Sequence, residues 1–346
     1  MPRVLVERGI PAPRAGGLGD PVAASYSPSM GLLERERELD VLARAFAAAA
    51  DGTGSGVAVS GEPGAGKSAL VAVACAADHG LRVLRGRCDP LATPRPLGPV
   101  RDLLADVWPL EGAAPLADVC EAAYAVVRAE PTVLVVEDLH WVDAASAEVL
   151  RFLLRRVEAM PCALVLTYRD DEVGEQHSVR PLLGDLATMD AVTTLRLPPL
   201  SVAGVATLLA GAPLDPEAVH ALTGGNAFFA TEVAKAPELP LPSTVRDAVL
   251  ARTAGVDPED FEVLQLAASA PGRLDDRVLP ALGVDLPTLR RLHDTGLLLR
   301  DRGGLVFRHE LARLAVESTI PSGAWPTCTP GCSAPWRRSS HGTPPC

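Results

Sequence analysis

The sequence lacks any apolar run of the roughly 18–20 residues that a membrane-spanning helix needs. Its start has no continuous apolar segment of the kind found in secretion signals. Aromatic residues make up only 4% of the chain while hydrophobic residues make up 48%, so the cores must be aliphatic. Lysine is almost missing, because only Lys67 and Lys235 are lysines among 32 basic residues. These absences predict a cytoplasmic chain that does not enter a membrane.

Positive charge and regularly spaced cysteines are scarce as well. The 32 basic residues face 43 acidic ones, which gives a net charge of −11. Broad binding to a phosphate backbone needs a positive surface, so this balance argues against it without excluding one small DNA-reading module. Cys75, Cys88, Cys120 and Cys162 show no metal-ligand spacing. We therefore interpret them as reduced structural thiols.

Helix and strand patterns alternate from residue 30 to about residue 198. Strand segments such as "VAVS", "TVLVVED" and "ALVLTYRD" begin with continuous apolar runs, which are typical of parallel strands covered on both faces. We therefore predict an α/β fold with a parallel sheet for residues 30–198, of the nucleotide-binding type. Residues 1–29 are rich in proline and glycine and have no period, so we predict a disordered leader.

Helical patterns replace the strands after "LRLPPLS". A proline-rich joint, "APELPLPS", divides the helical segments into two groups, and "GLLLRDRGGLVFRHE" reads as a hairpin after the second group. Three helices followed by a hairpin indicate a winged-helix domain over residues 241–320. The helices are predicted near residues 201–210, 215–222, 227–236, 245–254, 258–269 and 286–294.

The strongest motif is "GEPGAGKS", residues 61–68, which fits the phosphate-loop pattern G-x-x-x-x-G-K-[ST]. It lies between a strand and a helix, a context that a glycine-rich turn with a stray lysine does not explain. The glycines permit a tight loop whose N–H groups point at phosphate oxygens, and the next helix adds the positive end of its dipole. We expect Lys67 to reach the β- and γ-phosphates and Ser68 to ligate Mg²⁺. The predicted nucleotide contacts are Gly61, Glu62, Pro63, Gly64, Ala65, Gly66, Lys67, Ser68 and Ala69.

Two acids, Glu137 and Asp138, end the buried strand "TVLVVED". Ligands of α/β proteins bind at this end of the strands, so one carboxylate is expected to hold Mg²⁺ and the other to orient the attacking water. By their order we assign Glu137 to the metal and Asp138 to the water. The alternative, that the acids merely end a strand, is weakened by the phosphate loop upstream.

Thr167 and Arg169 end another strand. Arg169 is predicted either to sense the γ-phosphate or to form a surface salt bridge with Asp170 or Asp171, and the sequence leaves both open. His140 and Trp141 are expected to pack beneath the acidic pair in a structural role.

A series of blocks in fixed order resembles the STAND branch of AAA+-type ATPases, in particular the ATPase part of the large LuxR-type transcriptional regulators of actinobacteria. The resemblance covers roughly residues 30–320. The blocks are "LLERERELDVL", "GEPGAGKSAL", "CDPLATPRPLGPVRDLL", "VEDLHWVDAAS", "TYRDDE", "LRLPPLS" and "LTGGNAFFATEV".

This resemblance implies a helical lid at residues 199–240 and Arg35 near the adenine. It also implies downstream helical repeats and a DNA-binding helix-turn-helix, neither of which is in this chain. Two details depart from the family, which often has two aspartates where Glu137 and Asp138 stand, and a proline where Ala227 stands. The winged helix carries Arg290 and Arg291 on its third helix, but in this family that domain packs against the ATPase as a switch element.

The tail, residues 324–346, has no period and is rich in proline. A shifted reading frame that begins within the Ala324 codon permits an amphipathic helix there, so we interpret the tail as a disordered frameshift product and its cysteines as no metal site. The helix "ELARLAVEST" before it is then expected to fray. That would leave Leu311, Leu314 and Val316 partly uncovered.

The sequence thus predicts a switch that binds ATP with Mg²⁺ and hydrolyses it slowly to ADP and phosphate, as the N-terminal part of a LuxR-type regulator. The expected partners are ATP or ADP, other copies of the chain in the ATP state and an unidentified inducer, with neither DNA nor a membrane bound directly. Two alternatives stay open. One is the ATPase module of a cyclase- or kinase-linked signalling protein, and the other is an origin-recognition-like DNA-binding ATPase.

Overall fold

The computed structural model describes residues 32–321, except residues 78, 91–94, 106–113, 174–176, 237–240, 271 and 302. The predicted leader, residues 1–29, and the predicted aberrant tail, residues 324–346, lie outside the described residues. Contacts divide the chain after Gly31, and all the elements below belong to the unit Leu32–Cys346.

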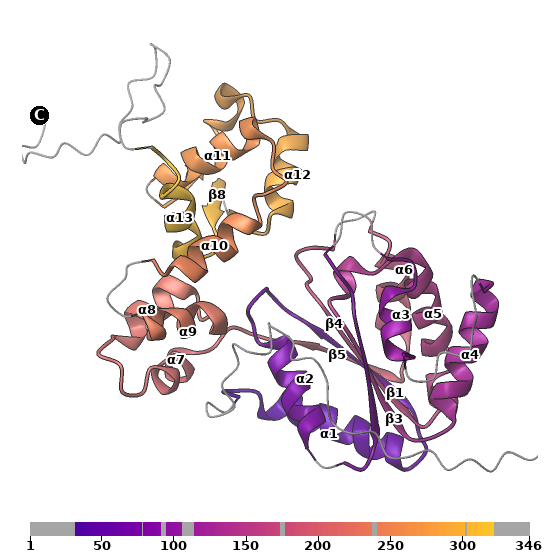
Figure 1. Ribbon diagram of the computed structural model, residues 1–346. Coiled ribbons are helices and arrows are strands. Elements are labelled where there is room, and N and C mark those ends of the chain that lie inside the picture. The colour runs from indigo at the N-terminus through magenta and orange to yellow at the C-terminus, as the bar shows by residue number, and fades with distance from the viewer. Residues whose placement is uncertain are drawn as a thin grey trace, which may run out of the picture. The chain divides into compact units, whose positions relative to one another are not determined.

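A five-stranded sheet forms the core of the first part of the chain (Figure 1). Its strand order is β2-β3-β4-β1-β5, and every neighbouring pair is parallel. The predicted α/β fold with a parallel sheet is therefore confirmed. The strands are β1 (Ser55–Ser60), β2 (Arg82–Arg87), β3 (Thr132–Glu137), β4 (Cys162–Tyr168) and β5 (Val192–Arg196).

Helices cover both faces of this sheet (Figure 1). Because side chains alternate between the faces of a strand, Val133 and Val135 of β3 enter the core beneath α1 and α2, while Leu134 and Val136 enter the core beneath α3 to α6. Both faces are buried, which explains the continuous apolar run of this strand. The helices are α1 (Glu36–Ala50), α2 (Lys67–Ala76), α3 (Gly98–Leu103), α4 (Leu116–Arg128), α5 (Ala144–Leu154) and α6 (Arg180–Thr188).

Helices follow β5, close to the positions that the sequence predicted. Side-chain oxygens of Ser201, Asp215, Asn226 and Asp285 accept hydrogen bonds from backbone N–H groups in the first turns, which fixes where four of these helices begin. The helices are α7 (Val202–Leu208), α8 (Pro216–Thr223), α9 (Ala227–Lys235), α10 (Ser243–Ala251), α11 (Pro258–Ser269), α12 (Leu286–Asp294) and α13 (Glu310–Glu317).

The expected hairpin consists of β7 (Leu298–Asp301) and β8 (Gly304–Phe307). A third strand, β6 (Leu274–Asp275), pairs antiparallel with β8. The sequence analysis missed β6, because two residues are too short for any strand period.

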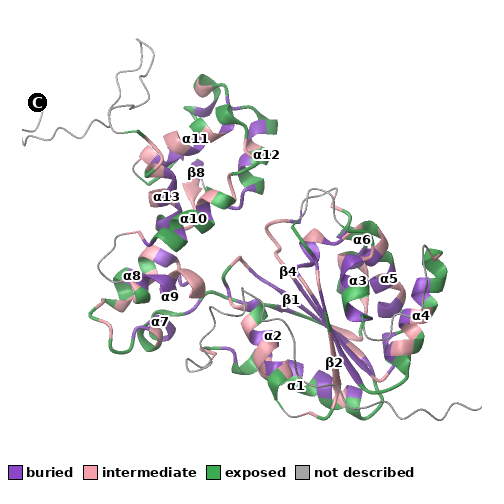
Figure 2. Cartoon of the chain, viewed as in Figure 1, coloured by how far each residue is buried: buried purple, intermediate pink, exposed green. Residues whose placement is uncertain are grey.

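The expectation that Leu311 and Val316 of α13 would be partly uncovered was wrong, whereas Leu314 is partly buried as expected. Leu311 and Val316 are 0% exposed, and Leu314 packs against the same core. Figure 2 shows buried positions along α13. The cover comes from α8, α10 and α11, which contact α13. The helix therefore needs no further repeat to bury its apolar face.

Candidate functional site

The carboxyl ends of β1, β3 and β4 meet at one edge of the sheet. Ser60 at the end of β1 pairs in register with Tyr168 of β4, and Val136 of β3 pairs with Leu166. The glycine-rich loop follows β1, Glu137 and Asp138 lie at the end of β3, and Arg169 follows β4. The structure thus brings together the three motifs that the sequence singled out, at the edge where α/β folds bind ligands.

Lys67 is held inside the glycine-rich loop. Its Nζ donates to the carbonyl oxygens of Gly61 at 2.7 Å and Glu62 at 3.0 Å, and the residue is only 7% exposed. Burial, and then the charge of Arg169, lower the pKa of the ammonium from 10.5 to about 8. Both of these hydrogen-bond partners are neutral carbonyls, so an anion bound beside Nζ would stabilise the ammonium.

The carbonyl oxygens of residues 63–65 also accept hydrogen bonds from protein groups outside the loop. A trans peptide points its C=O and N–H in opposite directions, so the adjoining N–H groups of Gly64 and Gly66 face the other way, while the Ala65 N–H donates to the Glu62 carbonyl at 3.1 Å. Together with the N-terminus of α2, the N–H groups of Gly64 and Gly66 could form a cradle for an anion. The donors are Asn226 Nδ2 to Pro63 (2.8 Å), the Phe228 N–H to Gly64 (3.1 Å) and the Arg35 guanidinium to Ala65 (3.4 Å).

Glycine is required at position 64 of this loop. Gly64 has a φ of +79°, and a Cβ there would lie 2.7 Å from side-chain atoms of both Asn226 and Phe228. The loop and the start of α9 are therefore in direct contact. From the sequence, the resemblance alone placed "LTGGNAFFATEV" in the lid, and this contact with the loop was not predicted.

Ser68 and Glu137 meet across the site. The Ser68 hydroxyl donates to Glu137 Oε2 at 2.5 Å, although the two residues are 69 positions apart in the chain. A hydroxyl and a carboxylate are both oxygen ligands of the kind that Mg²⁺ prefers, so this pair fits the predicted metal-binding role. Among the described residues, no cluster of three or more His, Cys, Asp or Glu side chains forms a separate metal site.

Asp138 is buried and held in an unusual backbone conformation. Its φ is +60°, and its N–H donates to Thr167 Oγ1 at 3.1 Å. Its carboxylate forms an ion pair with Arg87, whose Nε and terminal nitrogen both lie 3.2 Å from Oδ2. Sequence reasoning missed Arg87, although it ends β2 directly beside Glu137 in the register of the sheet.

Arg169 pairs with Glu172 at 2.6 Å and stacks over the Trp141 ring, 5.0 Å from its centre. The predicted alternative of a bridge to Asp170 or Asp171 therefore gives way to Glu172. The reason is that the two aspartates have other partners. Asp170 pairs with Arg196 (3.0 Å) and Asp171 with Arg252 (3.2 Å).

His140, which was expected to pack beneath the acidic pair, lies close to Asp138 and Glu172. Its Nε2 is 3.4 Å from Glu172 and 3.9 Å from Asp138. Burial, then the nearby charge of Arg169, lower its pKa to about 3, so the imidazole is neutral and these approaches are not ion pairs. Its ring contacts Trp141, which suits a structural role.

Glu62 of the loop is contacted by residues from the far end of the chain. Arg308 donates to Oε1 at 2.6 Å, and His309 Nε2 lies 3.1 Å from Oε2. The hydrogen bond from His309 is the largest cause that lowers the pKa of Glu62 to about 2, while burial opposes it. Stability from this contact is fully present above pH 4.5 and is lost as the pH falls towards 2. No pattern in the sequence predicts this contact, because Arg308 is 246 positions and His309 is 247 positions from Glu62.

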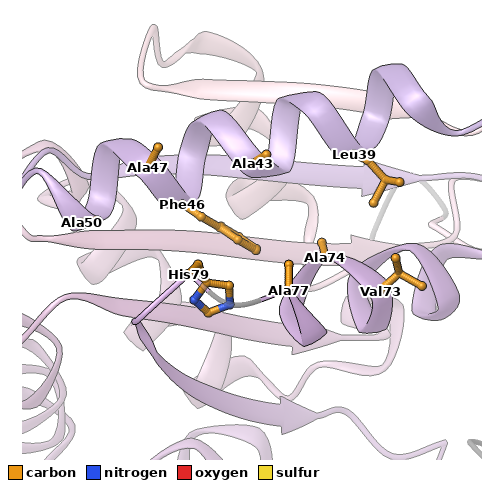
Figure 3. Close-up of a pocket in the computed structure, with 9 residues that line it drawn as sticks. All are labelled: Leu39, Ala43, Phe46, Ala47, Ala50, Val73, Ala74, Ala77 and His79. Carbon is orange, nitrogen blue, oxygen red and sulfur yellow. The ribbon is translucent and has the colours of Figure 1, made fainter.

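An apolar hollow of about 490 Å³ lies between α1 and α2 (Figure 3). Phe46, Leu39 and Val73 line it with several alanines. Among the residues that line it, His79 is the one that has a polar side chain. It contains no residue of the glycine-rich loop or the acidic pair. Its lining offers little to bind a phosphate, so we place the functional site at the strand ends.

None of the helices within the described residues is long and apolar enough to cross a membrane. Residues 31–166 match the profile of the AAA ATPase domain. This match covers less than half of the chain and ends within β4.

Solved structures agree with this fold. A Walker-type ATPase of Pyrococcus abyssi is 12% identical with a TM-score of 0.53, over 82% of this chain and 96% of that one. At this identity the likeness shows the fold alone.

Two other similar structures have lower TM-scores. A signal transduction ATPase with numerous domains (STAND) and a tetratricopeptide repeat sensor, from Pyrococcus horikoshii, is 17% identical with a TM-score of 0.42, over 83% of this chain and 42% of that one. The chain thus spans less than half the length of that protein. The ORC1 protein of Aeropyrum pernix in complex with DNA is 18% identical with a TM-score of 0.47, over 84% of this chain and 92% of that one. The comparison with curated proteins gives no match.

Proposed function

We propose that this chain is an ATP-dependent switch that binds ATP with Mg²⁺ at residues 61–68 and hydrolyses it slowly. Support for nucleotide binding comes from the cradle of loop N–H groups, the buried Lys67 ammonium and the AAA ATPase match. Lys67 binds the β- and γ-phosphates in this proposal. The ammonium then exchanges neutral carbonyl partners for anionic oxygens, which is the stronger interaction.

Ser68 and Glu137 would hold Mg²⁺, which neutralises charge on the phosphates when it is bound. Their contact at 2.5 Å supports this division of roles, with Asp138 left to orient the attacking water. Slow hydrolysis is supported by the ion pairs that Asp138 and Arg169, the residues proposed to act on water and on the γ-phosphate, already form within the protein. Arg87 pairs with the Asp138 carboxylate, and Arg169 pairs with Glu172. Each side chain must exchange its partner before it can act on water or on a γ-phosphate.

The observation that carries the switch is the contact of Glu62 with Arg308 and His309. Glu62 belongs to the loop that would hold phosphate, whereas the other two residues follow the β8 strand. A nucleotide that rearranges the loop therefore acts directly on a distant part of the chain. We propose that residues 199–240 form the lid of the site and residues 241–320 a winged-helix domain that reads its state.

This winged-helix domain is proposed as a switch element that does not read DNA. Arg291, one of two arginines on α12 that could contact DNA, forms a bidentate ion pair with Asp260 and also donates to Thr288. The net charge of −11 supports the same conclusion. In the LuxR-type regulators that the sequence resembles, a separate helix-turn-helix has that role.

The switch is tested by replacing Glu62 with glutamine, which keeps the size of the side chain and removes the charge. Amide hydrogen exchange of residues 304–317 should become faster in Glu62→Gln, and the difference between the ATP and ADP states should shrink in that segment. Glu148→Gln is the matched control, because Glu148 is an exposed acid that pairs only within α5. Equal exchange in wild type and Glu62→Gln in both nucleotide states would refute the switch.

A further inference from the structure

Arg35 is a buried cation with backbone carbonyls as its hydrogen-bond partners. It is 2% exposed, and its guanidinium donates to Pro198 at 2.6 Å, to Glu34 at 2.9 Å and to Ala65 at 3.4 Å. Burying a charge is costly unless its hydrogen bonds are made, so the position of this group is defined by those carbonyls. One terminal nitrogen bridges Ala65 and Pro198.

The two bridged carbonyls belong to different parts of the molecule. Ala65 lies in the loop proposed to bind phosphate, and Pro198 lies in the connector between β5 and α7. Pro198 and Pro199 have no N–H groups to donate, so the connector depends on contacts from elsewhere. At its near end Leu197 donates to Ser60 at 2.9 Å, which keeps it beside β1.

The far end of the connector is held by the residue next to Arg35. The Glu34 carboxylate accepts hydrogen bonds from the N–H of Ser201 (2.8 Å) and from its hydroxyl, at the start of α7. These bonds lower the pKa of Glu34. A Cβ on Gly204 would lie 2.7 Å from the same carboxylate, so the two segments are in close contact.

The connector also contacts the other lid helices. The Leu200 N–H donates to the carbonyl of Gly225 at 2.8 Å, and His220 Nε2 lies 3.1 Å from the Leu200 carbonyl oxygen. Gly225 precedes α9, and His220 belongs to α8. Two adjacent residues before α1 therefore join the loop to a connector that itself contacts all three helices.

We propose that Arg35 is a positioning residue that couples the state of the phosphate loop to helices α7 to α9, with Glu34 as its partner at the connector. Arg35 acts through the Ala65 and Pro198 carbonyls and not by contact with the nucleotide base. This inference rests on the proposed nucleotide binding. Coupling between sites is reciprocal. If the nucleotide shifts the conformational equilibrium of the connector by some factor, a partner that shifts this equilibrium changes the nucleotide affinity by the same factor.

The substitution Arg35→Lys is the sharpest test. Its ammonium keeps the charge but lacks the second terminal nitrogen, which in Arg35 donates to the Glu34 carbonyl while the first bridges Ala65 and Pro198. Arg37→Lys is the matched control, because Arg37 is an exposed residue on the first turn of α1. Gly204→Ala is a second variant that displaces the Glu34 carboxylate and leaves the Arg35 side chain unchanged.

The experiment uses the full chain with MgADP as the probe, and it measures ADP affinity by calorimetry and amide exchange of residues 202–235. In wild type and Arg37→Lys, saturating MgADP should slow exchange there by about tenfold, within the usual range of coupling between sites. Arg35→Lys should still bind ADP, no more than about tenfold more weakly, and should lose most of that slowing. Gly204→Ala should lose part of the slowing of amide exchange by MgADP. If Arg35→Lys fails to fold, Gly204→Ala provides the test of the coupling.

Full slowing in Arg35→Lys, or in Gly204→Ala where Arg35→Lys does not fold, would overturn the coupling. Equal loss in Arg37→Lys would overturn it too. Wild type that binds MgADP without any change in residues 202–235 would also overturn it, while the proposed nucleotide binding would stand. Wild type that binds no MgADP would refute the proposed function itself and this inference with it.

Discussion

Nucleotide binding should take up a proton at alkaline pH, because the Lys67 ammonium is destabilised in the free protein. Its pKa is lowered from 10.5 to about 8, mainly by burial. A bound triphosphate would place anionic oxygens beside Nζ and raise this pKa again. At pH 9, about nine tenths of the free protein would carry a neutral Lys67 and must protonate it on binding. ATP affinity at pH 9 should therefore be about tenfold weaker than the limit reached below pH 8.

The ligand-free protein should show the opposite trend. Since the folded-state pKa of Lys67 lies below its unfolded value, the unfolded chain holds more protons between about pH 8 and 10.5. The Lys67 contribution to folding stability therefore rises through that window and is least favourable below it. Affinity and this part of the stability thus change in opposite directions with pH.

Calorimetry in two buffers with different ionisation enthalpies measures the proton uptake directly. The range from pH 8 to 9.5 is suitable, since the terminal phosphate ionises near pH 6 and is fully ionised there. Wild type and Lys235→Ala should take up close to one proton at pH 9. No proton uptake at pH 9, together with an affinity that is constant from pH 7 to 9.5, would refute the reasoning.

Two further results are expected. Asp138→Asn should retain ATP binding and lose turnover in a steady-state phosphate-release assay, because the carboxylate orients water. If Glu137→Gln abolishes turnover with binding intact while Asp138→Asn does neither, the two roles are reversed. Leu311→Ala should lower the free energy of unfolding in urea by about 2–5 kcal/mol, since it leaves a cavity in a closed core. Leu314→Ala, at a partly buried position, should lower the free energy of unfolding by less. Small and equal decreases in both variants would show that α13 is poorly packed.

Features with a local signature could be predicted from the sequence. The glycine-rich loop has a fixed spacing between a strand and a helix, and the apolar run before Glu137 and Asp138 marks a buried strand. These two signals were sufficient to predict the parallel sheet and the edge where the site lies. The approach of Ser68 to Glu137 followed from them, because parallel strands end at the same edge.

Features that depend on distant partners could not be predicted. Arg308 and His309 reach Glu62 across most of the chain, and no period or spacing links them. The cover of α13 was missed for the same reason, since it comes from helices that precede it by many residues. The salt-bridge alternative for Arg169 named Asp170 or Asp171, and it was wrong because these two aspartates pair with Arg196 and Arg252 from other elements.

The central claim is that the loop of residues 61–68 binds ATP, and titration calorimetry with MgATP at pH 7 tests it most directly. Wild type and Lys235→Ala should bind MgATP with equal affinity, since Lys235 is an exposed residue paired with Glu232 in α9. Lys67→Ala should bind about 10- to 100-fold more weakly, the range expected when charge-assisted hydrogen bonds are lost. Equal affinity in wild type and Lys67→Ala, or no binding by folded wild type, would contradict the claim.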